Sequence, residues 1–255
     1  MYRFLLLLFL ILLPVGASRA LPVTITESPL PDSLRIVVIG SSTAAGCGTS
    51  ERDSAWVWRY RSWLEQLNPA YEVINLAESG HSSYQLLPSG FAAPAGRPRV
   101  DTACNITRAL ALHPSAVIIS LPSNDASGNY SILEQTENFE RIAEEAARAH
   151  VPLWVCTTQP RDLSDAKRQN LITMRDWIHN RFGDFALDFW TGTALADGTI
   201  DPVFDHGDGI HLNDEGHALL FSRVLDAAIP ERLNKTDWNR ASSSARDTLI
   251  QTITH

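Results

Sequence analysis

Short apolar runs rich in β-branched residues alternate with longer amphipathic stretches along this chain, and this alternation restricts the possible folds most. Each run has the length of one buried strand, and each amphipathic stretch has the length of a helix. Strands that alternate with helices predict a parallel sheet covered by helices on both faces. The predicted strands are residues 35–39, 72–76, 116–121, 153–157 and 185–187, and the predicted helices are residues 54–67, 132–150, 163–181 and 213–228.

Functional groups of such a fold belong on the loops at the carboxyl ends of the strands. The first strand is followed by Gly40, Ser41 and Ser42. A glycine next to a serine at a strand-to-helix turn can present a hydroxyl beside backbone N–H groups. The glycine patterns of phosphate-binding and dinucleotide-binding loops are absent, and so is the strict G-x-S-x-G motif. A purely structural turn therefore remains an alternative interpretation of this segment taken alone.

Two further loops carry candidate donors to a developing oxyanion. Gly80 follows the second strand, where a positive φ would allow its N–H to point at a ligand. Asn124 follows the third strand, and a side-chain amide at a strand end can donate a hydrogen bond to an oxyanion. Both residue types are also frequent in ordinary turns, so neither is diagnostic by itself.

Two Asp-x-x-His pairs lie near the start of the last predicted helix, namely Asp208 with His211 and Asp214 with His217. A carboxylate three residues before a histidine, across a tight turn, can accept a hydrogen bond from the ring and fix the tautomer of a base. Because Asn213 and Asp214 should cap the helix, His217 is expected on the helix face. The sequence therefore favours Asp208 and His211 as the functional pair.

Taken in this order, the chain resembles the SGNH hydrolases, the GDSL esterase/lipase superfamily, whose sequence blocks are a Ser, a Gly, an Asn and a C-terminal Asp-x-x-His. The matching residues are Ser42, Gly80, Asn124, and Asp208 with His211, and the resemblance spans about residues 35–228. It implies a three-layer, flavodoxin-like α/β/α sandwich around a five-stranded parallel sheet.

The resemblance also implies a role for each matching residue. Ser42 would be the nucleophile, His211 the general base and Asp208 the carboxylate that orients it. The oxyanion hole would consist of the backbone N–H groups of Ser42 and Gly80 and the side chain of Asn124. The resemblance implies that no cofactor or metal is needed.

The chain departs from the family pattern at two positions. The Gly-Asp-Ser of the family is Gly40-Ser41-Ser42 here, and Ser41 can still form local hydrogen bonds. The usual glycine two places before Asn124 is Pro122, which has no N–H. We expect a changed loop shape at Pro122 and retained chemistry, because the nucleophile and the amide are both present.

The N-terminus has the layout of a secretory signal peptide. Arg3 precedes an unbroken apolar run over residues 4–13, and Ser18 and Ala20 supply small residues before a cleavage site. This run is too short to span about 30 Å of hydrocarbon, so no stable membrane anchor is expected. We predict a signal peptide over residues 1–20, a hydrolase domain over 21–234, a polar tail over 235–255, and a secreted or periplasmic location.

Charge and cysteine content limit the partners further. The formal net charge is −8 and no basic run occurs, which argues against a nucleic-acid partner. Three cysteines allow at most one intramolecular disulfide. Cys156 lies in an apolar run and should be buried, which leaves Cys47 and Cys104 as the only plausible pair.

The predicted function is hydrolysis of carboxylic esters by a Ser-His-Asp mechanism. The lack of an added lid of apolar helices favours short acyl groups, and hence a carbohydrate O-acetylesterase acting on a small ester or an acetylated carbohydrate. A lipase, lysophospholipase or thioesterase of the same superfamily is the alternative. A metal-dependent hydrolase that uses the dense Asp and His residues at 205–217, or a non-catalytic binding protein, are alternatives of other classes. Four tryptophans form either a sugar platform or part of the core: Trp56, Trp58, Trp63 and Trp190.

Overall fold

The computed structural model describes residues 30–121 and 123–233, so the predicted signal peptide, Pro122 and the polar tail lie outside the described residues. The chain forms a five-stranded sheet of order β2-β1-β3-β4-β5 in which all four pairings are parallel. The carboxyl ends of the strands therefore lie at one edge of the sheet. The strands are β1 (Leu34–Gly40), β2 (Tyr71–Asn75), β3 (Ala116–Ser120), β4 (Leu153–Cys156) and β5 (Ala186–Leu187).

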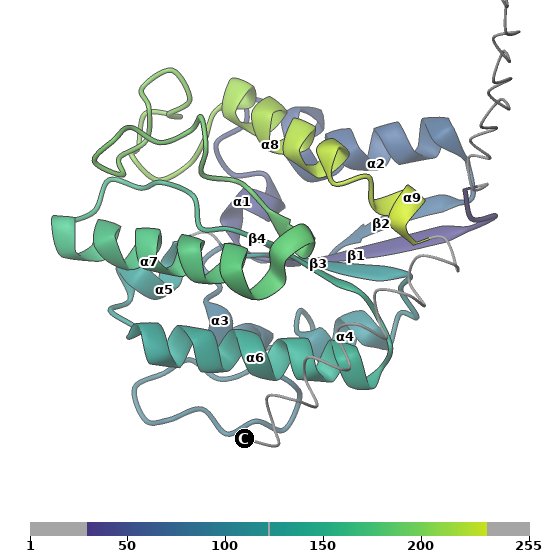
Figure 1. The fold of residues 1–255 in the computed structure, drawn as a ribbon, viewed down its shortest axis with the longest axis horizontal. Helices are drawn as coiled ribbons and strands as arrows, with labels where there is room; N and C mark the ends of the chain where they lie inside the picture. Colours follow the sequence, from purple (N-terminus) through teal and green to yellow (C-terminus); the bar gives the residue numbers. More distant parts are fainter. Residues whose placement is uncertain (1–29, 122, 234–255) are drawn as a thin grey trace, which may run out of the picture.

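Helices cover both faces of the sheet, which confirms the predicted α/β/α class (Figure 1). One face is covered by α2 (Trp56–Leu67), α8 (Asp214–Asp226) and α9 (Ile229–Arg232). The other face is covered by α3 (Ser83–Leu86), α4 (Ile106–Leu110), α6 (Ile132–Arg148) and α7 (Asp165–Phe182). Two short helices, α1 (Ser42–Ala45) and α5 (Asn124–Ser127), directly follow the β1 and β3 segments, and η1 (Arg52–Ser54) and η2 (Gly183–Phe185) are single 3₁₀ turns.

Successive residues of β1 belong to the two different cores, as expected for a strand buried on both faces. Ile36 and Val38 pack with side chains of α2 and α8, such as Tyr60 and Val224. Val37 and Ile39 pack with side chains of α6 and α7, such as Ile142 and Met174.

The ends of the long helices follow local capping rules. Helix α6 begins with a capping box in which Ser131 Oγ accepts from the Glu134 N–H at 3.2 Å and Glu134 accepts from the Ser131 N–H at 2.9 Å. Helix α8 begins after Asn213, whose side chain accepts from the Gly216 N–H at 3.0 Å. This confirms the predicted cap at Asn213. Among the residues that the structure describes, no helix is both long and apolar enough to cross a membrane.

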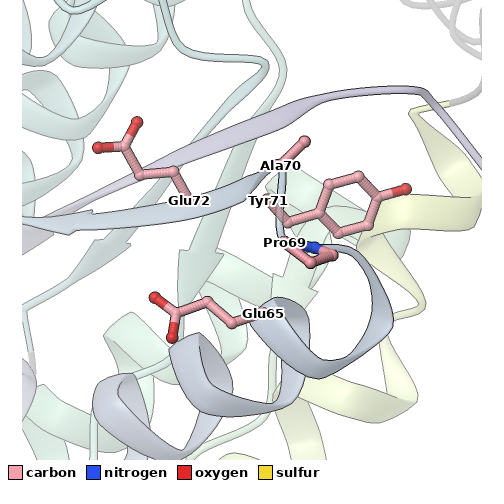
Figure 2. A pocket seen from close by; sticks show the side chains of 5 residues that line it. All are labelled: Glu65, Pro69, Ala70, Tyr71 and Glu72. Carbon is pink, nitrogen blue, oxygen red and sulfur yellow. The ribbon is translucent and has the colours of Figure 1, made fainter.

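A groove lies where α2 turns into β2, at the amino end of that strand (Figure 2). The carboxylates at this groove are paired with arginines, Glu65 with Arg61 at 2.7 Å and Glu72 with Arg35 at 2.8 Å. Because the predicted catalytic residues lie beyond the carboxyl ends of the strands, the groove is on the opposite edge of the sheet. Its lining residues are Glu65, Pro69, Ala70, Tyr71 and Glu72.

Asp125 is a buried carboxyl group that ties the loop after β3 to the loop after β2. It is 5% exposed and accepts hydrogen bonds from the Ser83 N–H at 3.0 Å and from the Ser83 hydroxyl. Asn138 of α6 donates to the same hydroxyl at 2.9 Å. Burial raises the pKa of Asp125 to about 6, although the hydrogen bonds from Ser83 favour the charged form.

The raised pKa of Asp125 predicts a specific pH dependence of stability. The folded state favours the protonated carboxyl, so the contribution of Asp125 is present below pH 4 and is lost as the pH rises through 6. Relative to Asp125→Asn, which is neutral at every pH, the free energy of unfolding of the wild type should fall by roughly 3 kcal/mol over this range. Urea unfolding of both proteins from pH 3 to pH 7 measures the difference. A difference that does not change with pH would contradict the prediction.

Candidate active site

Ser42 stands at the point where β1 turns directly into α1. Gly40 packs so closely on β3 that a Cβ would lie 2.2 Å from the Ser120 carbonyl oxygen, so only glycine fits without displacing backbone. The Ser41 N–H donates to the same carbonyl at 3.0 Å. Gly46, with a φ of 95°, ends the short helix. Ser42 is therefore fixed at the carboxyl end of β1, with 9% of its surface exposed.

The backbone N–H groups of Ser42 and Gly80 donate no hydrogen bond to an acceptor in the described part of the chain. Gly80 has a φ of 85° and nothing lies within 4 Å of the position of a Cβ, so the backbone conformation and not space favours glycine there. The N–H groups of Ser42 and Gly80 are therefore two unused donors where the oxyanion hole is predicted. Asn75 at the end of β2 also donates from Nδ2 to the Ala44 carbonyl of α1 at 2.7 Å.

Asn124 begins α5, and its amide joins the loops that follow β1, β2 and β3. Its Nδ2 donates to Ser41 Oγ at 2.7 Å and to the His81 carbonyl oxygen at 2.8 Å. Ser41, which replaces the aspartate of the family pattern, is completely buried and provides this local contact. Because both hydrogens on Nδ2 already have acceptors, an oxyanion must replace one of these acceptors before Asn124 can donate to it.

The loop between β5 and α8 brings Asp208 and His211 into direct contact. Asp208 Oδ2 lies 2.7 Å from His211 Nδ1, and Oδ1 accepts from the N–H groups of Ile210 at 2.9 Å and His211 at 2.8 Å. Burial raises the pKa of Asp208, but these hydrogen bonds outweigh burial and lower it to about 2. Because Asp208 is charged at neutral pH, it holds the proton of the neutral ring on Nδ1. His211 Nε2 then carries the lone pair that a base needs.

Backbone packing holds His211 beside the segment that follows the predicted nucleophile. A Cβ on Gly48 would lie 2.8 Å from His211 Cβ and 2.2 Å from the Leu212 carbonyl oxygen, and the φ of Gly48 is 96°. The ring of His211 is hydrogen-bonded to Asp208, and no hydrogen bond joins it to the Ser42 hydroxyl in this structure. Such bonds are often long in the absence of a substrate.

Gln159, in the loop after β4, connects the two halves of the predicted site. It is 1% exposed, its Oε1 accepts from Thr43 Oγ1 at 2.8 Å, and its Nε2 donates to the Ile210 carbonyl at 3.2 Å. Thr43 follows Ser42 and Ile210 precedes His211, so one side chain spans the segments that carry the predicted nucleophile and base. Sequence reasoning missed Gln159, because its only signal is that a polar residue follows the strand.

The second Asp-x-x-His pair has a different structure. His217 is fully buried, its Nδ1 accepts from the Trp56 N–H at 3.2 Å, and its Nε2 donates to the Cys47 carbonyl at 3.2 Å. Burial lowers the pKa of His217 to about 4, so the ring is neutral near pH 7 and both nitrogens are used. No hydrogen bond joins it to Asp214. His217 is therefore a structural residue that ties the loop after α1 to α2 and α8.

The three cysteines are free thiols. Cys47 Sγ lies 3.2 Å from Ser79 Oγ, and no disulfide joins Cys47 to Cys104. Cys156 is 1% exposed, which confirms its predicted burial, and burial raises the pKa of its thiol. Within residues 30–121 and 123–233, no group of three or more His, Cys, Asp or Glu side chains is arranged to hold a metal ion.

The five-stranded parallel sheet and the helices on both of its faces define a three-layer α/β/α sandwich of the SGNH hydrolase type. The family model of the GDSL-like Lipase/Acylhydrolase family matches residues 38–219, a segment that contains all five predicted site residues. The chain therefore belongs to the GDSL-like lipase/acylhydrolase family, and it is a carboxylic ester hydrolase.

Solved structures share this fold at low sequence identity. A GDSL-like lipase from Bacteroides thetaiotaomicron VPI-5482 is 18% identical with a TM-score of 0.57, over 78% of this chain and 90% of that chain. The psychrotrophic esterase EstA from Pseudoalteromonas sp. is 16% identical with a TM-score of 0.55, over 77% of this chain and 97% of that chain. The acetyl xylan esterase AlAXEase is 15% identical with a TM-score of 0.58, over 76% of this chain and 99% of that chain. No sequence among the curated proteins compared matches the chain.

Removal of the Gln159 side-chain amide should slow the chemical step without weakening substrate binding. Gln159→Leu leaves the Thr43 hydroxyl and the Ile210 carbonyl without their buried partner. We expect kcat for a p-nitrophenyl ester to fall roughly 10- to 100-fold, with KM within about twofold, if the rate depends on how the predicted nucleophile and the predicted base are placed.

Gln169→Leu, an exposed position on α7, is the matched control and should keep wild-type kcat. A folded Gln159→Leu protein with unchanged kcat, or with a raised KM alone, would rule out the positioning role.

Proposed function

We propose that the protein is a secreted serine esterase with Ser42 as nucleophile, His211 as general base and Asp208 as the carboxylate that orients it. The observation that carries the proposal is the 2.7 Å contact between Asp208 Oδ2 and His211 Nδ1, which leaves Nε2 available to Ser42. In the first step Ser42 Oγ attacks the ester carbonyl carbon and transfers its proton to His211 Nε2. The carbonyl oxygen becomes negatively charged and accepts hydrogen bonds from the N–H groups of Ser42 and Gly80.

The remaining steps use the same groups in the reverse order. The tetrahedral intermediate collapses, His211 protonates the departing alcohol, and the acyl group stays on Ser42. Water then gives a proton to His211 as it attacks the acyl-enzyme. The second tetrahedral intermediate collapses, His211 returns this proton to Ser42 Oγ, and the acid is released. Asn124 contributes to the oxyanion hole when the oxyanion replaces Ser41 Oγ or the His81 carbonyl as the acceptor of its amide.

For the substrate, we propose a short acyl group on a carbohydrate, most simply an O-acetyl group. The acetyl xylan esterase with the same fold supports this assignment. A long acyl chain needs a continuous apolar surface. The large exposed apolar side chains of the described residues lie on separate segments of the chain, at Leu30, Leu67, Leu133, Leu195 and Val203. A lipase or thioesterase activity is therefore the less favoured candidate.

The tryptophans do not favour a sugar platform. Trp56 is completely buried and Trp190 is 7% exposed, so both belong to the core. Trp63 stacks on Tyr60 with ring centroids 5.8 Å apart. The Arg52 guanidinium lies 3.6 Å above the ring centroid of Trp58 and covers one of its faces. A carbohydrate substrate would have to be recognised by other residues.

Covalent labelling tests the serine mechanism. A fluorophosphonate probe should label the wild type and Ser62→Ala, which changes an exposed serine of α2, but should not label Ser42→Ala. Esterase activity of Ser42→Ala and His211→Ala should fall roughly 10³-fold or more. Activity that survives Ser42→Ala and is abolished by EDTA would instead identify a metal-dependent hydrolase, and a folded, unlabelled wild type would indicate a binding protein.

An ester panel tests the acyl group. We expect kcat/KM to be highest for p-nitrophenyl acetate and to decline along the series from C2 to C16, because the large exposed apolar side chains of the described residues lie on separate segments. Acetate release from acetylated xylan and pectin, measured beside this series, tests the carbohydrate part of the proposal. A preference for C8 or longer esters would replace the acetylesterase assignment with a lipase or thioesterase.

A further inference from the structure

Arg161 places a guanidinium group between the predicted oxyanion hole and the predicted catalytic carboxylate. It belongs to the loop after β4, and its Nη1 lies 3.3 Å from Asn124 Oδ1 and 3.4 Å from Ser123 Oγ. Burial lowers the pKa of Arg161, and the nearby Asp208 carboxylate opposes this effect. The guanidinium group therefore lies among the loops that carry Asn124 and Asp208, at the carboxyl edge of the sheet.

Most of the hydrogen-bonding capacity of Arg161 is unused. Its Nε is buried and has no acceptor, and both Nη1 contacts are long for hydrogen bonds. Two other arginines form bidentate pairs with carboxylates, Arg97 with Glu134 and Arg181 with Glu140, whereas Arg223 resembles Arg161 in having a buried Nε without an acceptor. No carboxylate of the described residues forms such a pair with Arg161.

An unpaired charged donor in a partly buried position is unfavourable, and a ligand that supplies the acceptor removes this cost. A planar guanidinium matches a carboxylate, which can accept two parallel hydrogen bonds from it. The formal net charge of −8 does not attract anions at long range, so any preference for an anionic substrate must come from a local group.

We propose that Arg161 recognises a carboxylate of the ester substrate, close to the carbonyl group that Ser42 attacks. The inference rests on the proposed serine mechanism and names a substrate class for the same site. The carboxylate can lie on the acyl side of the ester, as in a half-ester of a dicarboxylic acid. It can also lie on the alcohol side, as in an acetylated uronic acid.

Two matched pairs of esters test the proposal and distinguish the two sides. Phenyl hydrogen succinate against phenyl butyrate tests the acyl side, and 4-acetoxybenzoate against its methyl ester tests the alcohol side, each after subtraction of spontaneous hydrolysis. The variants are Arg161→Met, Arg161→Lys, and the control Arg148→Met, which changes an arginine with a side chain 65% exposed on α6.

In at least one pair, the wild type and Arg148→Met should show kcat/KM at least tenfold higher for the anionic ester. Arg161→Met should lower kcat/KM for that ester roughly 10- to 100-fold and for its neutral partner less than threefold, because only the anionic ester loses a charge-assisted contact. Arg161→Lys should retain part of the preference, and added salt should reduce it.

Two results would overturn the proposal. One is a wild type that hydrolyses the neutral member of both pairs at least as well as the anionic member. The other is an equal loss for both members in Arg161→Met, which would mean that Arg161 acts through the orientation of Asn124. Fluorophosphonate labelling of Ser42 in the same samples reports on the serine mechanism separately, so labelled protein without an anionic preference leaves the esterase intact and rejects only the role of Arg161.

Discussion

The close approach of β1 to β3 at their carboxyl ends determines the geometry of the site. Gly40 lies against the Ser120 carbonyl with no room for a Cβ, and the Ser41 N–H donates to that same carbonyl. This contact sets where β1 ends, and therefore where Ser42 emerges relative to Asn124 after β3. The loops that follow β2, β3 and β4 each form a hydrogen bond to this turn, at Gly40, Ser41 and Thr43, so the turn joins four loops. Glycine is needed at this point because any side chain would push the two strands apart.

The sheet and the long helices could be predicted because their patterns extend over whole elements. The helix predicted over residues 132–150 is α6 (Ile132–Arg148), and the strand predicted over 116–121 is β3 (Ala116–Ser120). The short helices α1, α3, α4, α5 and α9 have only four or five residues each. Such a segment completes little more than one turn and shows no apolar period, so the sequence does not distinguish it from a loop.

The sequence could assign the candidate site residues to strand ends, because a parallel sheet brings those ends to one edge. It could not supply contacts between loops that are distant in the chain. Thr43 and Gln159 are 116 residues apart, and nothing near Gln159 indicates that its amide is buried between two other loops. Likewise, the sequence could propose Asn124 as an oxyanion donor, but only the structure shows that Ser41 and the His81 carbonyl already accept its two hydrogens.

Near pH 5, unfolding changes the protonation of two buried groups, His217 and Asp125, in opposite directions. The pKa of His217 is about 4 in the folded protein against 6.5 for an ordinary histidine, so the ring takes up a proton on unfolding. Asp125 behaves in the opposite way, because its pKa falls from about 6 to 3.8 and its carboxyl releases a proton. The two groups offset each other, and their combined effect on stability varies little with pH in this range. The loops that they hold, after β1 and after β3, therefore keep uncharged anchors under mildly acidic conditions.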